Sequence, residues 1–339
     1  MRLKMFLQSG FWSNIDKTSE YGVRTRLWIT DSFKNSSIVT DVSEELLEKN
    51  NDLFWKILIK QGNYKRCTKN YIDEQIEALN ESNNLNLSAI YLLDKTQEEC
   101  DLIERKYGVV AICAESISQK HYLFNGDAFS LDKKRSYGLR YMEFKDKLRK
   151  PCNALIIIDP YLLCKYKKDD EGVLRFPNIS NNLESLLDAI LPEQELESDF
   201  HLTIVSSLDS KELKDKVNLK KPYEQIKKCL KRINRKKIKI GFFYIDRGFN
   251  RNVESFHSRH ILANNFIIDS EDGFDLFDDS GRITKNNPTL SIVFPFLVGD
   301  SRHDITKYVN WLRSVKKHVS ESSDDFYFGS KENRLFDLV

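Results

Sequence analysis

The residues best suited to catalysis or ligand binding lie in one segment of the chain, at His257, Arg259 and Asn264. An imidazole can attack phosphorus when one ring nitrogen is neutral and a partner orients the other. A guanidinium two residues away can bind phosphate oxygens through two parallel hydrogen bonds. A cluster of His257, Arg259 and Asn264 is therefore suited to holding a phosphate group.

The residue types in this segment favour binding over cleavage. Arg259 keeps a permanent positive charge, so phosphate binding is expected. Asn264 cannot supply the carboxylate that would orient His257 or balance its charge. His260 is a weak candidate for a general acid, because on an extended segment it points to the face opposite His257.

Further polar residues occur at defined places along the chain. Asp159-Pro160-Tyr161 follows one expected strand, Ser206 follows the next, and Asn264-Asn265 precedes Gly273. Over about 130 residues this order resembles the phospholipase-D-like superfamily, and is most similar to the C-terminal phospholipase-D-like domain of MIT-domain-containing proteins. Ser258 and the sequence Gly273-Phe274-Asp275 depart from that pattern.

The resemblance implies roles for individual residues. Superfamily members use H-x-K-x4-D, in which the His attacks phosphorus, the Lys neutralises a phosphate oxygen and the Asp orients the site. The domain associated with MIT is generally regarded as lacking catalysis. On this pattern the catalytic positions are His257, Arg259 and Asn264, and the phosphate-binding positions are Arg259, Asn265, Ser206 and Asp159.

The chain carries one such motif, whereas phospholipase-D chemistry generally uses two. No other histidine has Lys or Arg two residues later, as the sequences at His121, His201, His303 and His318 show. An active enzyme would therefore take its second histidine from the other subunit of a homodimer. Whether the protein is an enzyme stays open; if it is, we expect a metal-independent phosphodiesterase or nuclease of the phospholipase-D type.

A strongly basic segment offers a second route to polyanions. Between Lys211 and Lys239 there are thirteen Lys and Arg against three Asp and Glu, so this segment carries +10 and the rest of the chain −8. Pro222 is expected at the first position of a helix here, with Tyr223, Ile226 and Leu230 on its buried side. The alternative is a solvated face. The candidate nucleic-acid-binding residues are Lys227, Lys228, Lys231, Arg232, Arg235, Lys236 and Lys237.

The elements that position these residues predict an α/β protein of two domains. A strand at 87–93, a helix at 97–106 capped by Thr96 and Glu99, and a strand at 109–113 form a β-α-β unit. We place an N-terminal α/β or α+β domain at 1–149 and a phospholipase-D-like domain at 150–339, with a mixed sheet flanked by helices. Its strands are expected at 154–158, 200–205, 238–245 and 290–297, and its helices at 182–190 and 305–319.

Composition narrows the class of protein. No stretch approaches the roughly 20 apolar residues that span a bilayer, and the basic N-terminus reads as a first strand, so we expect a cytoplasmic protein. The cysteines lack metal-binding spacing. Asp94 and Glu115 have positions open to a metal pair, but a helix-start Asp and a solvent Glu are favoured. We therefore expect no metal and no cofactor.

Three functions follow, in order of preference. The first is a phosphodiester or nucleic-acid-binding protein with a degenerate site, in bacterial phage defence with a protein partner from that system. The second is the dimeric nuclease. The third is a scaffold that docks on an anionic membrane surface or on a protein.

Overall fold

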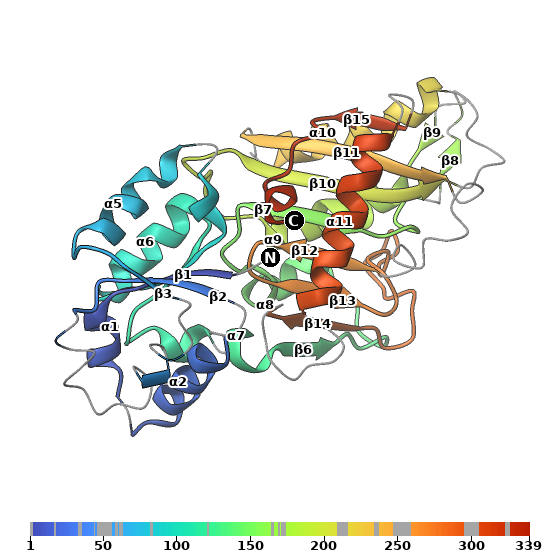
Figure 1. Ribbon diagram of the computed structural model, residues 1–339. Helices are drawn as coiled ribbons and strands as arrows, with labels where there is room; N and C mark the ends of the chain where they lie inside the picture. The colour runs from blue at the N-terminus through green and yellow to red at the C-terminus, as the bar shows by residue number, and fades with distance from the viewer. Residues whose placement is uncertain are drawn as a thin grey trace.

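The computed structural model places two β-sheets and helices on both sides of each, which is an α/β protein (Figure 1). No helix in the described part of the chain combines the length and apolar composition needed to cross a bilayer. The described residues are 3–16, 18–32, 36–43, 45, 56–57, 60, 64–81, 84–120, 122–163, 166–168, 170, 174–208, 216–233, 237–246, 259–294, 305–322 and 326–339.

The first unit is a five-stranded sheet in the order β3-β2-β1-β4-β5, with every pair parallel. Strands β4 and β5 are buried on both faces, as expected for a parallel sheet covered on both sides, whereas edge strand β3 is largely exposed. Helices α1 and α2 cover one face, and α5 and α6 cover the other (Figure 1). The strands are β1 (Leu3–Leu7), β2 (Ser36–Thr40), β3 (Tyr64–Arg66), β4 (Ile90–Leu92) and β5 (Val110–Ile112).

Local signals place the helices of this unit. Helix α6 (Gln97–Tyr107) starts with the predicted capping box, in which Thr96 and Glu99 each bond the other's backbone N–H. It ends at Gly108, whose φ of 63° is left-handed and favours glycine. The predicted β-α-β unit is confirmed, because β4 and β5 are parallel neighbours. The other elements are α1 (Ser9–Asn14), α2 (Glu20–Ser32), α5 (Tyr71–Glu77), η2 (Ala78–Asn80), η3 (Leu85–Ser88), η4 (Ile117–Lys120) and α7 (Tyr122–Asn125).

The second unit is an eight-stranded mixed sheet in the order β15-β11-β10-β7-β12-β13-β14-β6. Its central strands β7, β10 and β11 are parallel, and the remaining pairs are antiparallel. The strands are β6 (Asp127–Ser130), β7 (Ala154–Ile158), β10 (Phe200–Leu208), β11 (Ile238–Asp246), β12 (His260–Ala263), β13 (Ile267–Ser270), β14 (Thr289–Val293) and β15 (Tyr327–Gly329).

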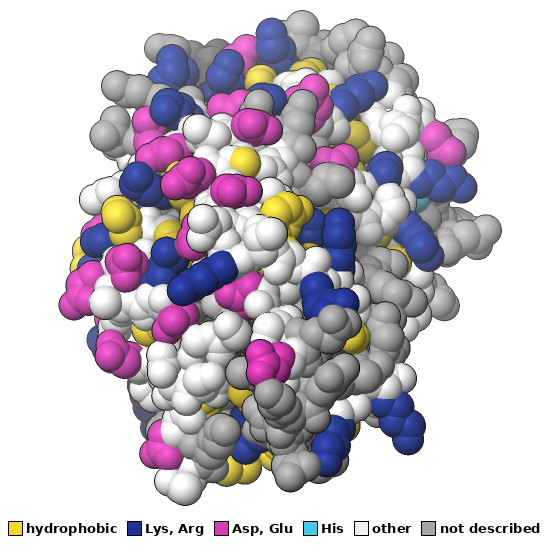
Figure 2. Space-filling view, turned by 60° about the vertical axis from the view of Figure 1, so that its left-hand side comes forward, with side chains coloured by type: hydrophobic (Ala, Val, Ile, Leu, Met, Phe, Trp, Pro, Cys, Tyr) yellow, Lys and Arg dark blue, Asp and Glu magenta, His cyan; other side chains and the backbone are white. Residues whose placement is uncertain are grey.

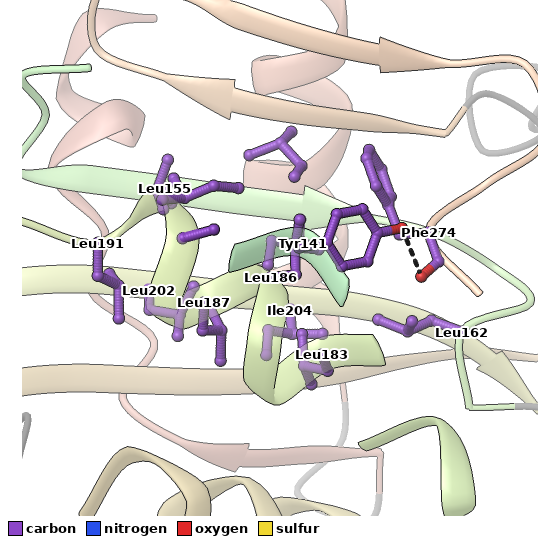
Figure 3. Close-up of a cluster of buried hydrophobic side chains, with 14 of the residues drawn as sticks. Tyr141, Leu155, Leu162, Leu183, Leu186, Leu187, Leu191, Leu202, Ile204 and Phe274 are labelled. Atoms are coloured by element: carbon purple, nitrogen blue, oxygen red, sulfur yellow. Dashed lines mark hydrogen bonds between the residues drawn. The ribbon is translucent and has the colours of Figure 1, made fainter. Parts of the chain in front are cut away.

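Two helical layers enclose this sheet. Helix α11 packs on one face, where Tyr308, Leu312 and Val315 meet Ile156 and Ile158. Helices α9 and α10 pack on the other face, where Figure 3 shows the leucines of α9 against β7 and β10. The helices and short elements are η5 (Arg140–Phe144), α8 (Lys145–Leu148), β8 (Lys167–Lys168), β9 (Leu174–Arg175), the π-helix η6 (Ile179–Leu183), α9 (Glu184–Ile190), α10 (Lys216–Arg232), α11 (Ile305–Glu321) and η8 (Arg334–Leu338).

Sheet membership changes earlier in the chain than the expected domain boundary at 149/150. Strand β6 pairs with β14 as an edge of the second sheet. Residues after it also join the second core, including Tyr137, Tyr141 and Leu148. The pairing of β6 is a long-range contact, with Ser130 opposite Thr289, so no local composition shift announces it.

The prediction that Pro222 opens a helix is wrong. Helix α10 begins at Lys216, and Pro222 lies inside it. Proline inside a helix removes one backbone hydrogen bond. Burial of Leu219, Ile226 and Leu230 against the sheet holds this helix in place.

Candidate functional site

Asp159 lies directly after β7, fully buried at the carboxyl end of the sheet. One carboxylate oxygen accepts the Tyr161 N–H at 2.8 Å, and the other accepts the Phe274 N–H at 2.8 Å. Burial raises the pKa of Asp159 to about 6, against the lowering effect of these two N–H groups and of Arg259. The carboxylate therefore fastens the loop that follows β13 to the end of β7.

Arg259 lies beside Asp159 across Gly273. A Cβ atom on Gly273 would come within 2.9 Å of the Arg259 Cδ and 3.1 Å of an Asp159 carboxylate oxygen, and its φ is +86°. The guanidinium stacks over the Tyr161 ring at 4.9 Å and donates to the Glu271 carbonyl oxygen. Its buried Nε has no hydrogen-bond partner among the described residues. Arg259 is thus a cation at the strand end, with one donor still available.

Ser206 lies on the neighbouring strand at the same end of the sheet. Val205 pairs with Ile158, so Ser206, near the end of β10, lies at the level of Asp159. The Ser206 hydroxyl is fully buried and lacks a hydrogen-bond partner within the described structure. Asp159, Ser206 and Arg259 are therefore brought to one end of the sheet, as the sequence predicted.

Asn264 does not belong to this site, so its predicted catalytic position is wrong. Strand β12 runs antiparallel to β7, with His260 opposite Ile158 and Ala263 opposite Leu155. Five residues of extended chain place Asn264 roughly 16 Å from Arg259, at the other end of the sheet. There its carbonyl oxygen accepts the Asn153 N–H at 3.1 Å, and its amide donates to the Gly108 carbonyl at 3.4 Å.

Asn265 follows Asn264 in the turn between β12 and β13, and the prediction that it binds phosphate beside Arg259 is wrong for the same reason. Its side chain is fully buried, and neither of its polar atoms has a hydrogen-bond partner among the described residues. The turn is closed by a backbone bond from Ala263 to Phe266. Both asparagines therefore belong to the turn at the far end of β12.

His260 points to the opposite face of the sheet from Arg259, as strand alternation requires. Its ring stacks on Trp311 of α11 at 4.0 Å, and its Nδ1 lies 2.9 Å from an Asp269 carboxylate oxygen. Packing between the sheet and α11 explains this histidine. His257, the predicted nucleophile, lies outside the described residues.

The basic face of α10 is exposed, as predicted for Lys227, Lys228, Lys231 and Arg232. Lys228 and Arg232 line a groove of about 430 Å³ between α10 and residues 174–180. Arg232 also forms a short ion pair with Glu184. Lys237 is exposed before β11 and lines a different pocket, with Leu191 and Phe200. Arg235 and Lys236 fall on residues that the structure leaves undescribed.

Arg175 was not predicted from the sequence. It lies on β9 and lines the groove between α10 and residues 174–180. Arg175 lies between two apolar residues, Leu174 and Phe176. Alternation along a short strand is the one sequence signal that predicts an outward-pointing side chain here. Lys221 was missed for a different reason, because placing the helix start at Pro222 left it outside the helix.

Asp94, one of the two acids considered for a metal, is held by protein contacts. Asp94 accepts the Asn14 amide at 2.8 Å, and it packs directly over Gly10. No group of three or more His, Cys, Asp or Glu with metal-binding geometry occurs among the described residues.

Comparisons with protein-family models and with curated proteins gave no match for this chain. The resemblance to the phospholipase-D-like superfamily therefore rests on the residues of this sequence.

Proposed function

We propose that this protein binds a phosphodiester polyanion, with nucleic acid as the first candidate, through a degenerate phospholipase-D-like unit. The groove between α10 and residues 174–180, here called the α10 groove, would hold the polyanion. The cluster of Asp159, Ser206 and Arg259 would be the remnant of the superfamily site.

The charge of the α10 groove carries this proposal. Four cations line it, Arg175, Lys221, Lys228 and Arg232, and among the described lining residues Glu224 is the one acid. Glu224 lies 3.7 Å from Lys220, which offsets its charge. Cations spaced along a groove suit a phosphate backbone, and such binding weakens as salt rises.

The shape of the α10 groove adds apolar surface to this charge. Phe176, Pro177 and Ile179 form part of the wall, and Gln225 and Ser180 add groups that can both donate and accept hydrogen bonds. On the face that Figure 2 shows, basic and acidic side chains are interspersed. The α10 groove thus combines cations, an apolar wall and hydrogen-bonding groups on one surface.

Binding is favoured over cleavage by the state of the strand-end cluster. Both Asp159 oxygens already accept backbone N–H groups, so this carboxylate orients a loop instead of a nucleophile. Asn264, which stands where the superfamily has an acid, bonds Asn153 and Gly108. A phosphate near Arg259 would meet a cation and one available N–H donor.

A salt titration tests the proposal. Labelled single-stranded and duplex DNA and RNA are titrated with wild type and with the double variant Lys221→Gln/Lys228→Gln, with EDTA present. Each lost phosphate contact lowers the slope of log K against log salt by about 0.9 for duplex DNA, so the variant should lose roughly 1.8.

The matched control is Arg313→Gln/Lys317→Gln, which removes two exposed cations from α11 on the other face of the sheet. Equal affinity and equal slope for both double variants would refute binding in the α10 groove. Cleavage that persists in EDTA and disappears in His257→Ala would instead establish the dimeric nuclease.

A further inference from the structure

The two units enclose a second pocket, which we call the junction pocket, of about 330 Å³. One wall is formed by α6, through Asp101, Glu104 and Arg105, and by Gly108. The other wall is formed by residues 149–152 and 192–194. Pockets between domains are common sites for small molecules, and this volume suits one of modest size.

Direct contacts fix the two walls relative to each other. The Lys106 ammonium lies 3.3 Å from Glu197, and the Glu197 N–H donates to the Lys106 carbonyl at 2.8 Å. Gly108 packs so closely that an added Cβ would lie 2.2 Å from the Cys152 carbonyl oxygen. The pocket is therefore preformed, so a ligand need not pay the entropy of assembling it.

Lys150 places a desolvated cation in this pocket. Its ammonium contacts the Asp146 carbonyl at 3.4 Å and the Tyr122 ring at 5.1 Å. Within the described structure, no carboxylate lies at ion-pair distance from it, and burial lowers the pKa of Lys150. This half-buried ammonium has only the longer-range attraction of Asp127 and Asp146, and an oxyanion in the pocket would give it a partner at contact distance.

Arg149 adds a second incompletely satisfied cation. One terminal nitrogen donates to the Asp188 carbonyl at 2.6 Å, and the other is 3.8 Å from Glu193, whose side chain is 80% exposed. The buried Nε of Arg149 has no hydrogen-bond partner among the residues described. The nearby acid Glu104 is already neutralised by Lys120 at 2.6 Å.

Tyr122 lies behind the pocket lining, with its ring under the Lys150 ammonium. The residue is 1% exposed, and its hydroxyl lacks a hydrogen-bond partner in the described part of the chain. Burial raises the pKa of Tyr122, with smaller contributions from Glu104 and Cys152, which both line the pocket. The hydroxyl therefore stays protonated and can donate.

We propose that the junction pocket binds the oxyanion group of a small molecule, a phosphate or a carboxylate, through Lys150, Arg149 and the Tyr122 hydroxyl. Arg149 and Lys150 line one preformed cavity between the two units, and the Tyr122 ring lies 5.1 Å from the Lys150 ammonium. This site is separate from the α10 groove, which is lined by other residues. A ligand here would also add contacts between the two units.

The test uses inorganic phosphate and citrate as probes at constant ionic strength, with chloride as the reference. Thermal unfolding and isothermal titration calorimetry are measured on the full chain. Wild type should show a rise in Tm with phosphate, citrate or both, and the probe that acts distinguishes phosphate from carboxylate recognition. Lys150→Gln should weaken the binding of that probe by at least about tenfold, as expected for losing a charge-assisted hydrogen bond.

Two further variants separate binding from folding. Tyr122→Phe removes a hydroxyl without a partner, so it should leave Tm without added anion unchanged or raised while weakening anion binding. Lys147→Gln changes an exposed lysine of the same segment and should bind as wild type does. Absence of any shift in wild type with either probe, or equal shifts in wild type, Lys150→Gln and Tyr122→Phe, would overturn the proposal.

Discussion

Replacing Asn153 tests how the two units are joined. This side chain is fully buried between β7 and the first sheet. Its amide donates to the carbonyl oxygens of Leu87 at 2.6 Å and Tyr107 at 3.1 Å, and its own carbonyl accepts from Arg334 at 3.0 Å. One residue therefore satisfies acceptors in the first unit and a buried guanidinium in the second.

The cost of Asn153→Ala follows from the groups left behind. Two buried carbonyls and one guanidinium lose a partner, and each unsatisfied group costs about 1–3 kcal/mol, which sums to roughly 3–9 kcal/mol. Arg334 also contacts the Asn153 backbone carbonyl at 3.3 Å and the Asp199 carbonyl at 3.3 Å. Because these backbone contacts remain in Asn153→Ala, we expect a loss of stability toward the lower end of this range. A domain with 5–15 kcal/mol of stability would be close to unfolding.

Urea unfolding, followed by tryptophan fluorescence and circular dichroism, measures this loss. Asn153→Asp separates the two halves of the interaction, because it keeps an acceptor for Arg334 but places an oxygen against the Leu87 and Tyr107 carbonyls. We expect it to be destabilising as well. The control Asn181→Ala removes a contact to exposed Asp279 and should change stability by less than about 1 kcal/mol. A loss below 1 kcal/mol in Asn153→Ala would refute the reasoning.

Two buried ionisable groups give opposite dependences on pH. Burial lowers the pKa of His201 to about 4 from 6.5, so the unfolded chain binds more protons between these values, and the advantage of wild type over His201→Gln should shrink by about 3 kcal/mol from pH 7 to pH 4. Chemical denaturation at several pH values measures it, and parallel curves for the two proteins would contradict it. Burial raises the pKa of Asp159 to about 6 from 3.8, so the folded chain binds more protons in that window. Wild type should therefore gain about 3 kcal/mol relative to Asp159→Asn as the pH falls below 6, and a loss would reverse the assignment.

Local features of the fold could be predicted because they depend on nearby residues. The Thr96 and Glu99 capping box and the Gly108 helix end involve atoms within a dozen residues of each other. Alternation along an extended segment also accounts for Arg259 and His260 lying on opposite faces, although the prediction itself compared His260 with His257, which lies outside the described residues. Proline at position 222 misled the helix prediction, since burial of the segment on both sides of it extends the helix back to Lys216.

The candidate site was predictable in part. Asp159, Ser206 and Arg259 meet because strands β7 and β10 are parallel and β12 begins where they end. Asn264 was assigned to the same cluster from the spacing of the motif. That spacing does not show that the chain after Arg259 runs as an extended strand away from the site. An extended strand moves the fifth residue to the far end of the sheet, where Asn264 serves the junction between the units.

By itself, the sequence determined the α/β class, several strand and helix positions and the basic face of α10, since propensity, periodicity and caps act over short separations. The tertiary structure alone decided the strand order, the pairing of β6 with β14 and the partners of Asn153 and Asn264. It also assembled the junction pocket, which joins Tyr122 and Lys150 to α6. These contacts connect residues that are tens to more than a hundred positions apart in the sequence. They form only when the complete sheets pack together.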